Sequence, residues 1–346
     1  MNFNFIQQSM ENSSTFNLAL QDMHASEWLL EQTKDILSGF FQSYLKALSE
    51  EGDKELALKN FKLFLELIKK ECLSPHTFAP YHIRIKEPFD YYKFGIEFIA
   101  PLVDINHSKV IGHSHLKQIQ EQIQAGDNVV FLANHQIEAD PQALSILLDN
   151  TYPGFAEEMI FVAGERVITD PVAIPFSLGR NLLCIYSKRY INHPPEKKLE
   201  KQLHNKRTME KMSQLFQEGG KVIYVAPSGG RDRLNSKGIV EVAPFDPSTI
   251  ELFFLMAQKA QRKTHFYPMS LLTYDLLPPP KTIQLALGEK REVRRSSIHL
   301  AIGEEIVMEA PQEMSPVDKK LYREQRAQKI WETVNTNYQL LLNQNR

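Results

Sequence analysis

One stretch constrains the fold most strongly, because in it a short apolar run leads through a polar turn into the start of a helix. Val129–Ala133 is continuously apolar and follows Gly126-Asp127-Asn128, which predicts a buried strand. Asp140 suits the N-cap of the next helix and Pro141 its first position, where a missing N–H costs nothing. We therefore expect His135 at the carboxyl end of a buried strand, the edge where open α/β sheets usually carry their sites.

The pairing of an imidazole with a carboxylate predicts a general base. An alcohol attacks poorly until a base removes its proton, and a histidine held by a carboxylate contributes about 10²–10⁴-fold to such reactions. We expect His135 and Asp140 to form this pair. Two alternatives stay open at this point, since Asp140 could only cap its helix and His135 could be an ordinary loop histidine. The spacing His-x₄-Asp is weak evidence by itself.

A glycine-containing basic loop follows a second predicted strand, at residues 221–226. Gly229 and Gly230 allow a ligand to approach the backbone closely, and their N–H groups are candidates for stabilising an oxyanion. Arg231 and Arg233 add permanent charge and forked donors. The loop predicts a phosphate site, although solvated arginines are the alternative.

A third predicted strand, at residues 181–186, leads into another basic loop. This loop carries Lys188, Arg189 and Tyr190. Basic residues at the ends of two strands, beside a histidine at the end of another, strengthen the prediction of a phosphate pocket.

Several blocks resemble the soluble, plastid-type glycerol-3-phosphate 1-O-acyltransferases and their bacterial relatives. The resemblance runs from about Ser74 to about Pro280, and Pro227-Ser-Gly-Gly-Arg231 stands where the wider lipid acyltransferase superfamily has a Pro-Glu-Gly-Thr-Arg type of block. That difference indicates the soluble branch. The matching blocks are Glu87–Gly95, Asn134–Pro141, Val162–Val167, Ile168–Pro171, Pro175–Asn181, Ala226–Arg233, His265–Pro268 and Pro278–Pro280.

The resemblance implies roles for individual residues. His135 and Asp140 take the positions of the family's catalytic pair, and Arg231 and Arg233 those of its phosphate-binding arginines. The third loop departs from the family, which typically shows Ser-Lys-Lys-His where this chain has Ser187-Lys188-Arg189-Tyr190. The arginine keeps the charge, whereas the tyrosine replaces a group that can be cationic with a neutral hydroxyl.

The resemblance also implies a reaction. We expect transfer of a fatty acyl group from an acyl thioester, of acyl carrier protein or coenzyme A, to the sn-1 hydroxyl of glycerol 3-phosphate. The product, 1-acyl-glycerol 3-phosphate, belongs to the first step of phospholipid synthesis. No metal and no cofactor is implied. The alternatives are an acyltransferase for another acceptor, such as lysophosphatidate, and a non-catalytic acyl-carrier or lipid-binding protein on the same fold.

Composition restricts the partners and the location. A formal charge of −2 gives no reason to expect nucleic acid binding. Cys72 and Cys184 are expected to be reduced core residues. The first twenty residues show neither a secretory signal nor a transit peptide, and no run reaches the roughly 20 apolar residues of a membrane span. We expect a soluble protein of the bacterial cytoplasm or plastid stroma, with at most a peripheral membrane contact.

The order of predicted elements indicates the fold class and the domains. An amphipathic pattern predicts a small helical bundle over residues 1–75, and the turn-rich segment 74–80 marks a boundary. Residues 76–346 alternate between strands and helices, which predicts an α/β domain with a mixed, largely parallel sheet flanked by helices. The helices are expected at 116–125, 141–150, 196–218, 248–262 and 317–342, and the strands at 129–133, 159–162, 181–186, 221–226 and 264–271.

Two basic clusters are candidates for docking an acidic acyl carrier protein. The first lies on the helix expected at 196–218 and includes Lys197, Lys201 and Lys211, and the second is Lys290–Arg295. A solvated helix face, with glutamates as partners, is the alternative. A polybasic membrane contact is a third possibility.

Overall fold

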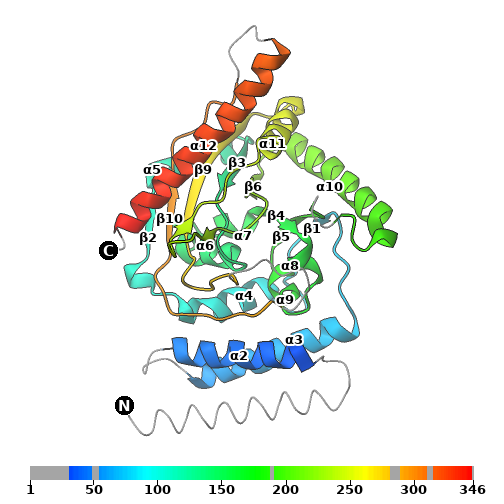
Figure 1. Ribbon diagram of the computed structural model, residues 1–346, viewed down its shortest axis with the longest axis vertical. Helices are drawn as coiled ribbons and strands as arrows, with labels where there is room; N and C mark the ends of the chain where they lie inside the picture. Colours follow the sequence, from blue (N-terminus) through cyan, green and yellow to red (C-terminus); the bar gives the residue numbers. More distant parts are fainter. Residues whose placement is uncertain (1–30, 49–53, 188–190, 281–288, 310–314, 345–346) are drawn as a thin grey trace.

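A mixed eight-stranded sheet forms the centre of the protein (Figure 1). The computed structural model describes residues 31–48, 54–187, 191–280, 289–309 and 315–344. The strand order is β1-β5-β4-β6-β3-β9-β10-β2. The strands are β1 (Tyr81–His82), β2 (Lys109–Ile111), β3 (Asn128–Ala133), β4 (Ile160–Gly164), β5 (Asn181–Ile185), β6 (Val222–Val225), β9 (Thr264–Leu272) and β10 (His299–Ile302).

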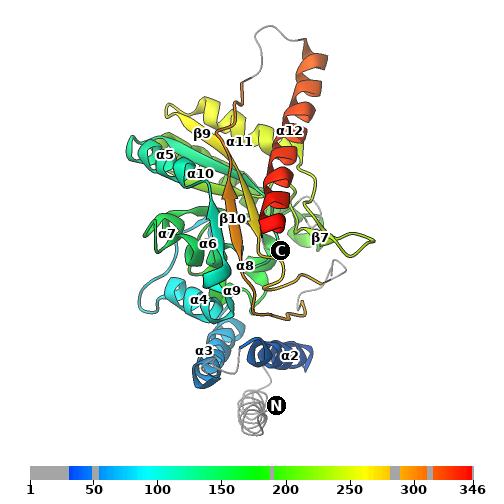
Figure 2. The same ribbon diagram turned by 90° about the vertical axis from the view of Figure 1, so that its left-hand side faces the viewer.

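The five central strands, β5-β4-β6-β3-β9, run parallel to one another. β1 pairs antiparallel with β5 at one edge, and β10 pairs antiparallel with β9 near the other. The predicted class, a mixed and largely parallel sheet flanked by helices, is therefore confirmed. The sequence did not predict β1, β2 and β10, because strands of 2, 3 and 4 residues are too short for a hydrophobic period to be recognised. A separate hairpin, β7 (Arg233–Leu234) with β8 (Val240–Glu241), extends beyond the sheet (Figure 2).

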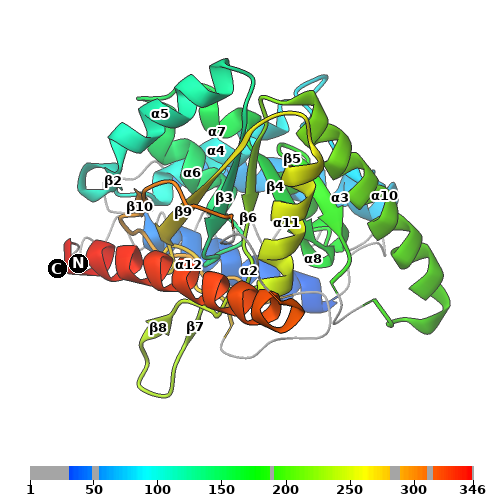
Figure 3. The same ribbon diagram turned by 90° about the horizontal axis from the view of Figure 1, so that it is seen from above.

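Strand β3 shows why its sequence is continuously apolar. Val129, Phe131 and Ala133 belong to the hydrophobic cluster on one face of the sheet, and Val130 and Leu132 to the cluster on the other. A strand that is covered on both faces has mostly apolar side chains, which is typical of parallel sheets. Figure 3 shows α5, α6 and α7 on one side of the strands and α11 and α12 on the other.

The helices agree closely with the predicted ranges where predictions were made. Each predicted helix of the α/β part is present, with its ends shifted by a few residues. The helices are α2 (Glu31–Ala47), α3 (Lys54–Leu73), α4 (Tyr91–Ile99), α5 (His113–Gln124), α6 (Asp140–Leu148), α7 (Phe155–Glu158), α8 (Glu165–Thr169), α9 (Ile174–Ser177), α10 (Lys198–Glu218), α11 (Pro247–Lys259) and α12 (Pro316–Gln344), with 3₁₀ helices at Ala100–Leu102, Ile105–His107 and Pro195–Lys197.

Helices α2 and α3 lie against α4 and α9 at one end of the molecule (Figures 1 and 2). Their contact is aromatic: the Phe64 ring centroid lies 5.2 Å from those of Phe98 on α4 and Phe176 on α9. The helical region predicted before residue 75 is present in residues 31–48 and 54–73. It shares one hydrophobic cluster with the sheet, and its status as a separate domain stays a prediction.

Three expectations about single features can be compared with the structure. Cys184 is buried and Cys72 half-buried, and both are free. Asp140 does not cap helix α6; its carboxylate instead turns back to the preceding loop, where it accepts hydrogen bonds from the backbone N–H groups of Gln136 and Ile137. Within the residue ranges given above, no helix combines the length and apolar character that a membrane span requires.

Candidate active site

His135 and Asp140 form a hydrogen-bonded pair at the carboxyl end of β3. The His135 Nδ1 and Asp140 Oδ2 atoms are 2.8 Å apart. Asp140 is 1% exposed, whereas the His135 side chain is 31% exposed. Because the carboxylate can only accept, Nδ1 carries the proton and donates it, and Nε2 keeps its lone pair. No partner within the described part of the chain occupies Nε2, so the ring presents a base on its exposed side.

The carboxylate of Asp140 is held from several directions. Its Oδ2 also accepts from the Gln136 N–H at 2.8 Å and the Ile137 N–H at 3.3 Å. Its Oδ1 accepts from the Thr273 hydroxyl at 2.6 Å. Buried charge is tolerated when it is saturated with hydrogen bonds, and these contacts fix both the carboxylate and the imidazole that donates to it.

A buried polar network connects the His135 loop to the arginine loop. The Asp232 N–H donates to the His135 carbonyl at 2.7 Å, and the Asp232 carboxylate accepts from the side-chain amides of Asn134 at 2.8 Å and Gln136 at 3.2 Å. Gln136 in turn accepts from the Thr273 N–H at 2.7 Å, which ties both loops to the end of β9. Asp232 thus lies between the two arginines and determines how their loop faces the histidine.

Asp232 is completely buried, and this affects its titration. Burial raises the pKa of its carboxyl to about 6, although hydrogen bonds from the Ala243 N–H, Asn134 and Gln136 act in the opposite direction. Desolvation penalises the charged form more than these donors compensate.

Arg231 does not point freely into solvent. Its Nη2 contacts both carboxylate oxygens of Glu289, at 2.6 and 2.7 Å, and Arg166 contacts the same carboxylate at 2.8 Å. Glu289 is buried. One nitrogen of the Arg231 guanidinium is therefore already paired with both oxygens of a buried carboxylate.

A second group of ion pairs lies beside the contacts of Arg231, Arg166 and Glu289, and the two groups together form the ion-pair wall of the site. Arg291 is buried and contacts Glu138 and Asp170, each at 2.9 Å. Burial alone would raise the pKa of Glu138, but the charges of Arg291 and Arg231 hold that pKa below its usual value. Arg291 belongs to the basic cluster that the sequence suggested for docking, and its burial removes it from that surface. Lys201 of the other cluster is likewise buried and pairs with Glu165 at 2.6 Å.

The remaining predicted phosphate ligands divide into two groups. Arg233 donates to the Pro280 carbonyl at 2.7 Å, and burial together with the nearby charge of Arg231 lowers the pKa of Arg233. Lys188, Arg189 and Tyr190 lie outside the described residues.

The backbone N–H groups considered for an oxyanion already have hydrogen-bond acceptors. Gly229 donates to the Ala226 carbonyl at 3.0 Å, and the Gly230 N–H lies 3.5 Å from the Ser228 hydroxyl.

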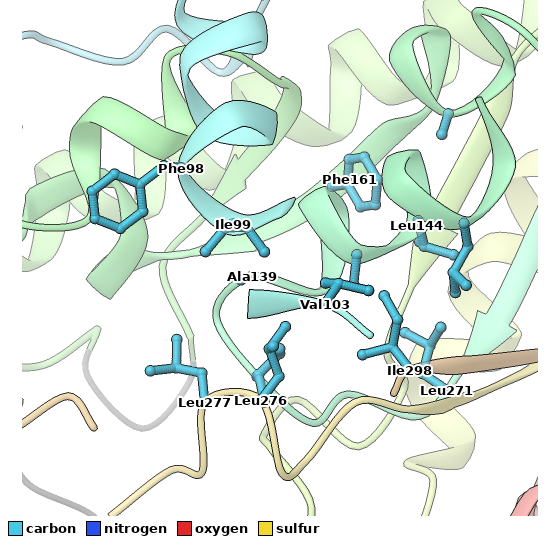
Figure 4. Packing of buried hydrophobic residues seen from close by; sticks show 14 of the residues in the cluster. Phe98, Ile99, Val103, Ala139, Leu144, Phe161, Leu271, Leu276, Leu277 and Ile298 are labelled. Carbon is cyan, nitrogen blue, oxygen red and sulfur yellow. The ribbon is translucent and has the colours of Figure 1, made fainter. Parts of the chain in front are cut away.

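An apolar cavity with a volume of about 150 Å³ adjoins the His135–Asp140 pair. Its lining combines residues of the loop between His135 and Asp140 with apolar side chains from several elements, including Ile99, Phe161 and Leu277. Figure 4 shows these three side chains around the loop at Ala139, each from a separate segment. An imidazole beside an apolar cavity, near a cluster of arginines paired with carboxylates, can accept a proton from a substrate that has an apolar part.

The residues that sequence reasoning missed at this site include Arg166, Asp232, Thr273 and Glu289. Arg166 and Asp232 lie inside blocks that resemble the family, so a signal for them was present. Thr273 and Glu289 follow no local pattern. For metals, no group of three or more His, Cys, Asp or Glu side chains in the described ranges is placed to hold an ion.

Comparison with known proteins agrees with the site. Residues 115–272, which include β3, β6, β9 and the loops just described, match the Acyltransferase family model. This stretch is an acyltransferase domain. The matched range begins within α5 and ends with β9, so the His135–Asp140 pair, Arg231 and Asp232 all belong to the acyltransferase domain, whereas Thr273 and Glu289 lie beyond its matched range.

Curated relatives extend the similarity beyond the acyltransferase domain. A chloroplastic glycerol-3-phosphate acyltransferase of Cucurbita moschata is 40% identical over 274 residues, which cover 78% of this chain and 61% of the relative. The chloroplastic enzyme of Arabidopsis thaliana is 39% identical over 295 residues, covering 83% of this chain and 62% of the relative. The chain thus spans about 60% of the length of these relatives. The resemblance found in the sequence is confirmed.

Proposed function

We propose that this protein transfers a fatty acyl group from an acyl thioester to the sn-1 hydroxyl of glycerol 3-phosphate. The observation that supports this most is the His135–Asp140 pair, whose partly exposed ring borders an apolar cavity and whose loop is hydrogen-bonded to the loop of Arg231 and Arg233. The names of the matched relatives point to the same acceptor. Those relatives are chloroplastic, which favours a plastid as the setting of the reaction.

His135 acts as the general base in the proposed mechanism. Its Nε2 takes the proton of the sn-1 hydroxyl while the oxygen attacks the thioester carbonyl, and Asp140 stabilises the imidazolium that forms. When the tetrahedral intermediate collapses, the C–S bond breaks and the imidazolium returns its proton to the departing sulfur. The products are 1-acyl-glycerol 3-phosphate and a free thiol, so protons and bonds balance without an acyl-enzyme.

Arginines orient the acceptor in this proposal. Arg231 and Arg233 bind the phosphate dianion, with Lys188, Arg189 and Tyr190 of the neighbouring loop as further ligands. A phosphate held by forked donors places the hydroxyl near the base. The translational and rotational entropy of the acceptor is then lost on binding, before the chemical step, which lowers the barrier of that step. The apolar cavity accepts the acyl chain of the donor, which is carried by acyl carrier protein or coenzyme A.

A turnover assay tests the proposal directly. The purified chain is incubated with acyl carrier protein and coenzyme A thioesters, each with glycerol 3-phosphate or with lysophosphatidate as acceptor. We expect lysophosphatidate formation from glycerol 3-phosphate. If only lysophosphatidate were acylated, the acceptor would be lysophosphatidate and not glycerol 3-phosphate. The absence of transfer to either acceptor would favour a lipid-binding protein.

His135→Ala separates catalysis from binding. Turnover should fall to background while calorimetric binding of glycerol 3-phosphate persists, because the arginines are unchanged. Retained turnover would remove His135 as the base.

A further inference from the structure

Helix α2 contributes to the cavity beside the active site. Phe40, in the middle of α2, lines the same cavity as His135, together with Ile99 of α4 and Phe176 of α9. Phe40 is buried. Phe40, which precedes His135 by 95 residues, thus supplies a large apolar side chain to the wall of the proposed acyl site.

The Phe40 ring is held by other aromatic rings. Its centroid lies 5.3 Å from that of Phe61 and 5.9 Å from that of Phe98. The contact with Phe61 is edge-on, at an interplanar angle of 75°, an arrangement that aromatic pairs favour. A ring packed in this way cannot move aside easily, because interiors are close-packed.

The position of α2 is also fixed by two polar contacts of residues that follow Phe40 on the same helix. The Val293 N–H donates to the Ser43 hydroxyl at 3.1 Å, two residues along the chain from Arg291, which lines the cavity. The Tyr44 hydroxyl donates to the Phe98 carbonyl at 2.7 Å. α2 is therefore connected both to the ion-pair wall of the site and to the helix that bears Ile99.

We infer that Phe40 limits the length of the acyl chain that the cavity accepts, so that helix α2 forms part of the substrate site. This inference rests on the proposed function, in which the cavity holds the acyl group. Each further methylene buried in an apolar cavity strengthens binding about fourfold. The gain must stop at the carbon that reaches the Phe40 ring, and longer chains must bend or stay partly outside.

The inference is tested by measuring the equilibrium binding of saturated acyl-coenzyme A in the absence of acceptor. The acyl chains range from about 8 to about 18 carbons. The affinity of the wild type should rise with acyl chain length and then level off. We call the chain length at which it levels off the break. Phe40→Ala should move the break to chains longer by about two carbons or more, and Phe40→Leu should move it less. The product profile in competition among donors should shift in the same direction.

Phe41→Ala is the matched control. Phe41 is a fully buried phenylalanine on the same helix that does not line the cavity, so its loss should lower the melting temperature without moving the break. An identical break in wild type, Phe40→Leu and Phe40→Ala would overturn the inference while leaving acyl transfer intact. A break displaced equally by Phe41→Ala would also overturn it. Absence of acyl-coenzyme A binding and of turnover in the wild type would instead overturn the proposed function.

Discussion

Asp140→Asn changes the charge behind His135 while preserving the shape of the site. In the wild type, Asp140 Oδ2 accepts from the backbone N–H groups of Gln136 and Ile137 as well as from His135, and Oδ1 accepts from Thr273. Asparagine must turn its oxygen toward the two backbone donors. Its NH₂ group then faces the Thr273 hydroxyl, which can accept. The imidazole should keep its orientation and its Nδ1 proton.

The expected loss of rate is therefore electrostatic. A carboxylate about 4 Å from an imidazolium is worth about 4 kcal/mol at an effective dielectric constant of about 20. About a third of the His135 side chain is exposed, and solvent screening reduces the figure to about 2–3 kcal/mol. This corresponds to a decrease in kcat of about 30- to 150-fold. A replacement that imposed the wrong tautomer would cost about 10⁴-fold, as in a serine protease triad.

The assay compares kcat of wild type, Asp140→Asn and His135→Ala at saturating glycerol 3-phosphate, with melting temperature as the control for folding. An unchanged kcat would show that the carboxylate does not stabilise a charge on His135. A loss as large as that of His135→Ala, in a folded variant, would show that the backbone donors do not hold the asparagine oxygen. Either result would refute the reasoning from the hydrogen-bond geometry.

Three further predictions concern other parts of the molecule. Arg231→Ala removes a forked, charged donor and should raise the KM for glycerol 3-phosphate by about 10- to 150-fold, with a smaller effect of Arg231→Lys; steady-state kinetics with an unchanged KM would place the phosphate elsewhere. The folded state binds the Asp232 proton more tightly than the unfolded state, because burial raises its pKa to about 6. This contribution to stability, at most about 3 kcal/mol, is fully present below the unfolded pKa and is lost as pH rises through about 6. In urea unfolding, the advantage of wild type over Asp232→Asn should therefore shrink from pH values near 4 toward 7, and a constant difference would contradict the assignment. Phe98→Ala should lower the free energy of unfolding by about 3–5 kcal/mol, because Phe98 is fully buried among the rings of Phe40, Phe61 and Phe64. A loss below about 1 kcal/mol would mean that the surrounding rings move to fill the space.

The sequence was sufficient for features that arise within one short segment. Continuous apolar character marks β3 because both of its faces are covered. His135 and Asp140 meet because the loop between them is short, so their pairing follows from local geometry. The mixed parallel sheet also followed from the alternation of elements, since parallel neighbours require crossover connections.

Tertiary structure alone determined the surroundings of that pair. Glu289 meets Arg231 and Arg166 from positions 58 and 123 residues away in sequence. Thr273 reaches Asp140 across 133 residues, and α2 brings Phe40 to the cavity wall. Hydrophobic patterns report which side chains are buried, whereas strand order determines which buried groups become neighbours. The hydrogen-bonded pair of His135 and Asp140 was therefore readable from the sequence, but the partners of these two residues depended on the order β5-β4-β6-β3-β9 in the folded sheet.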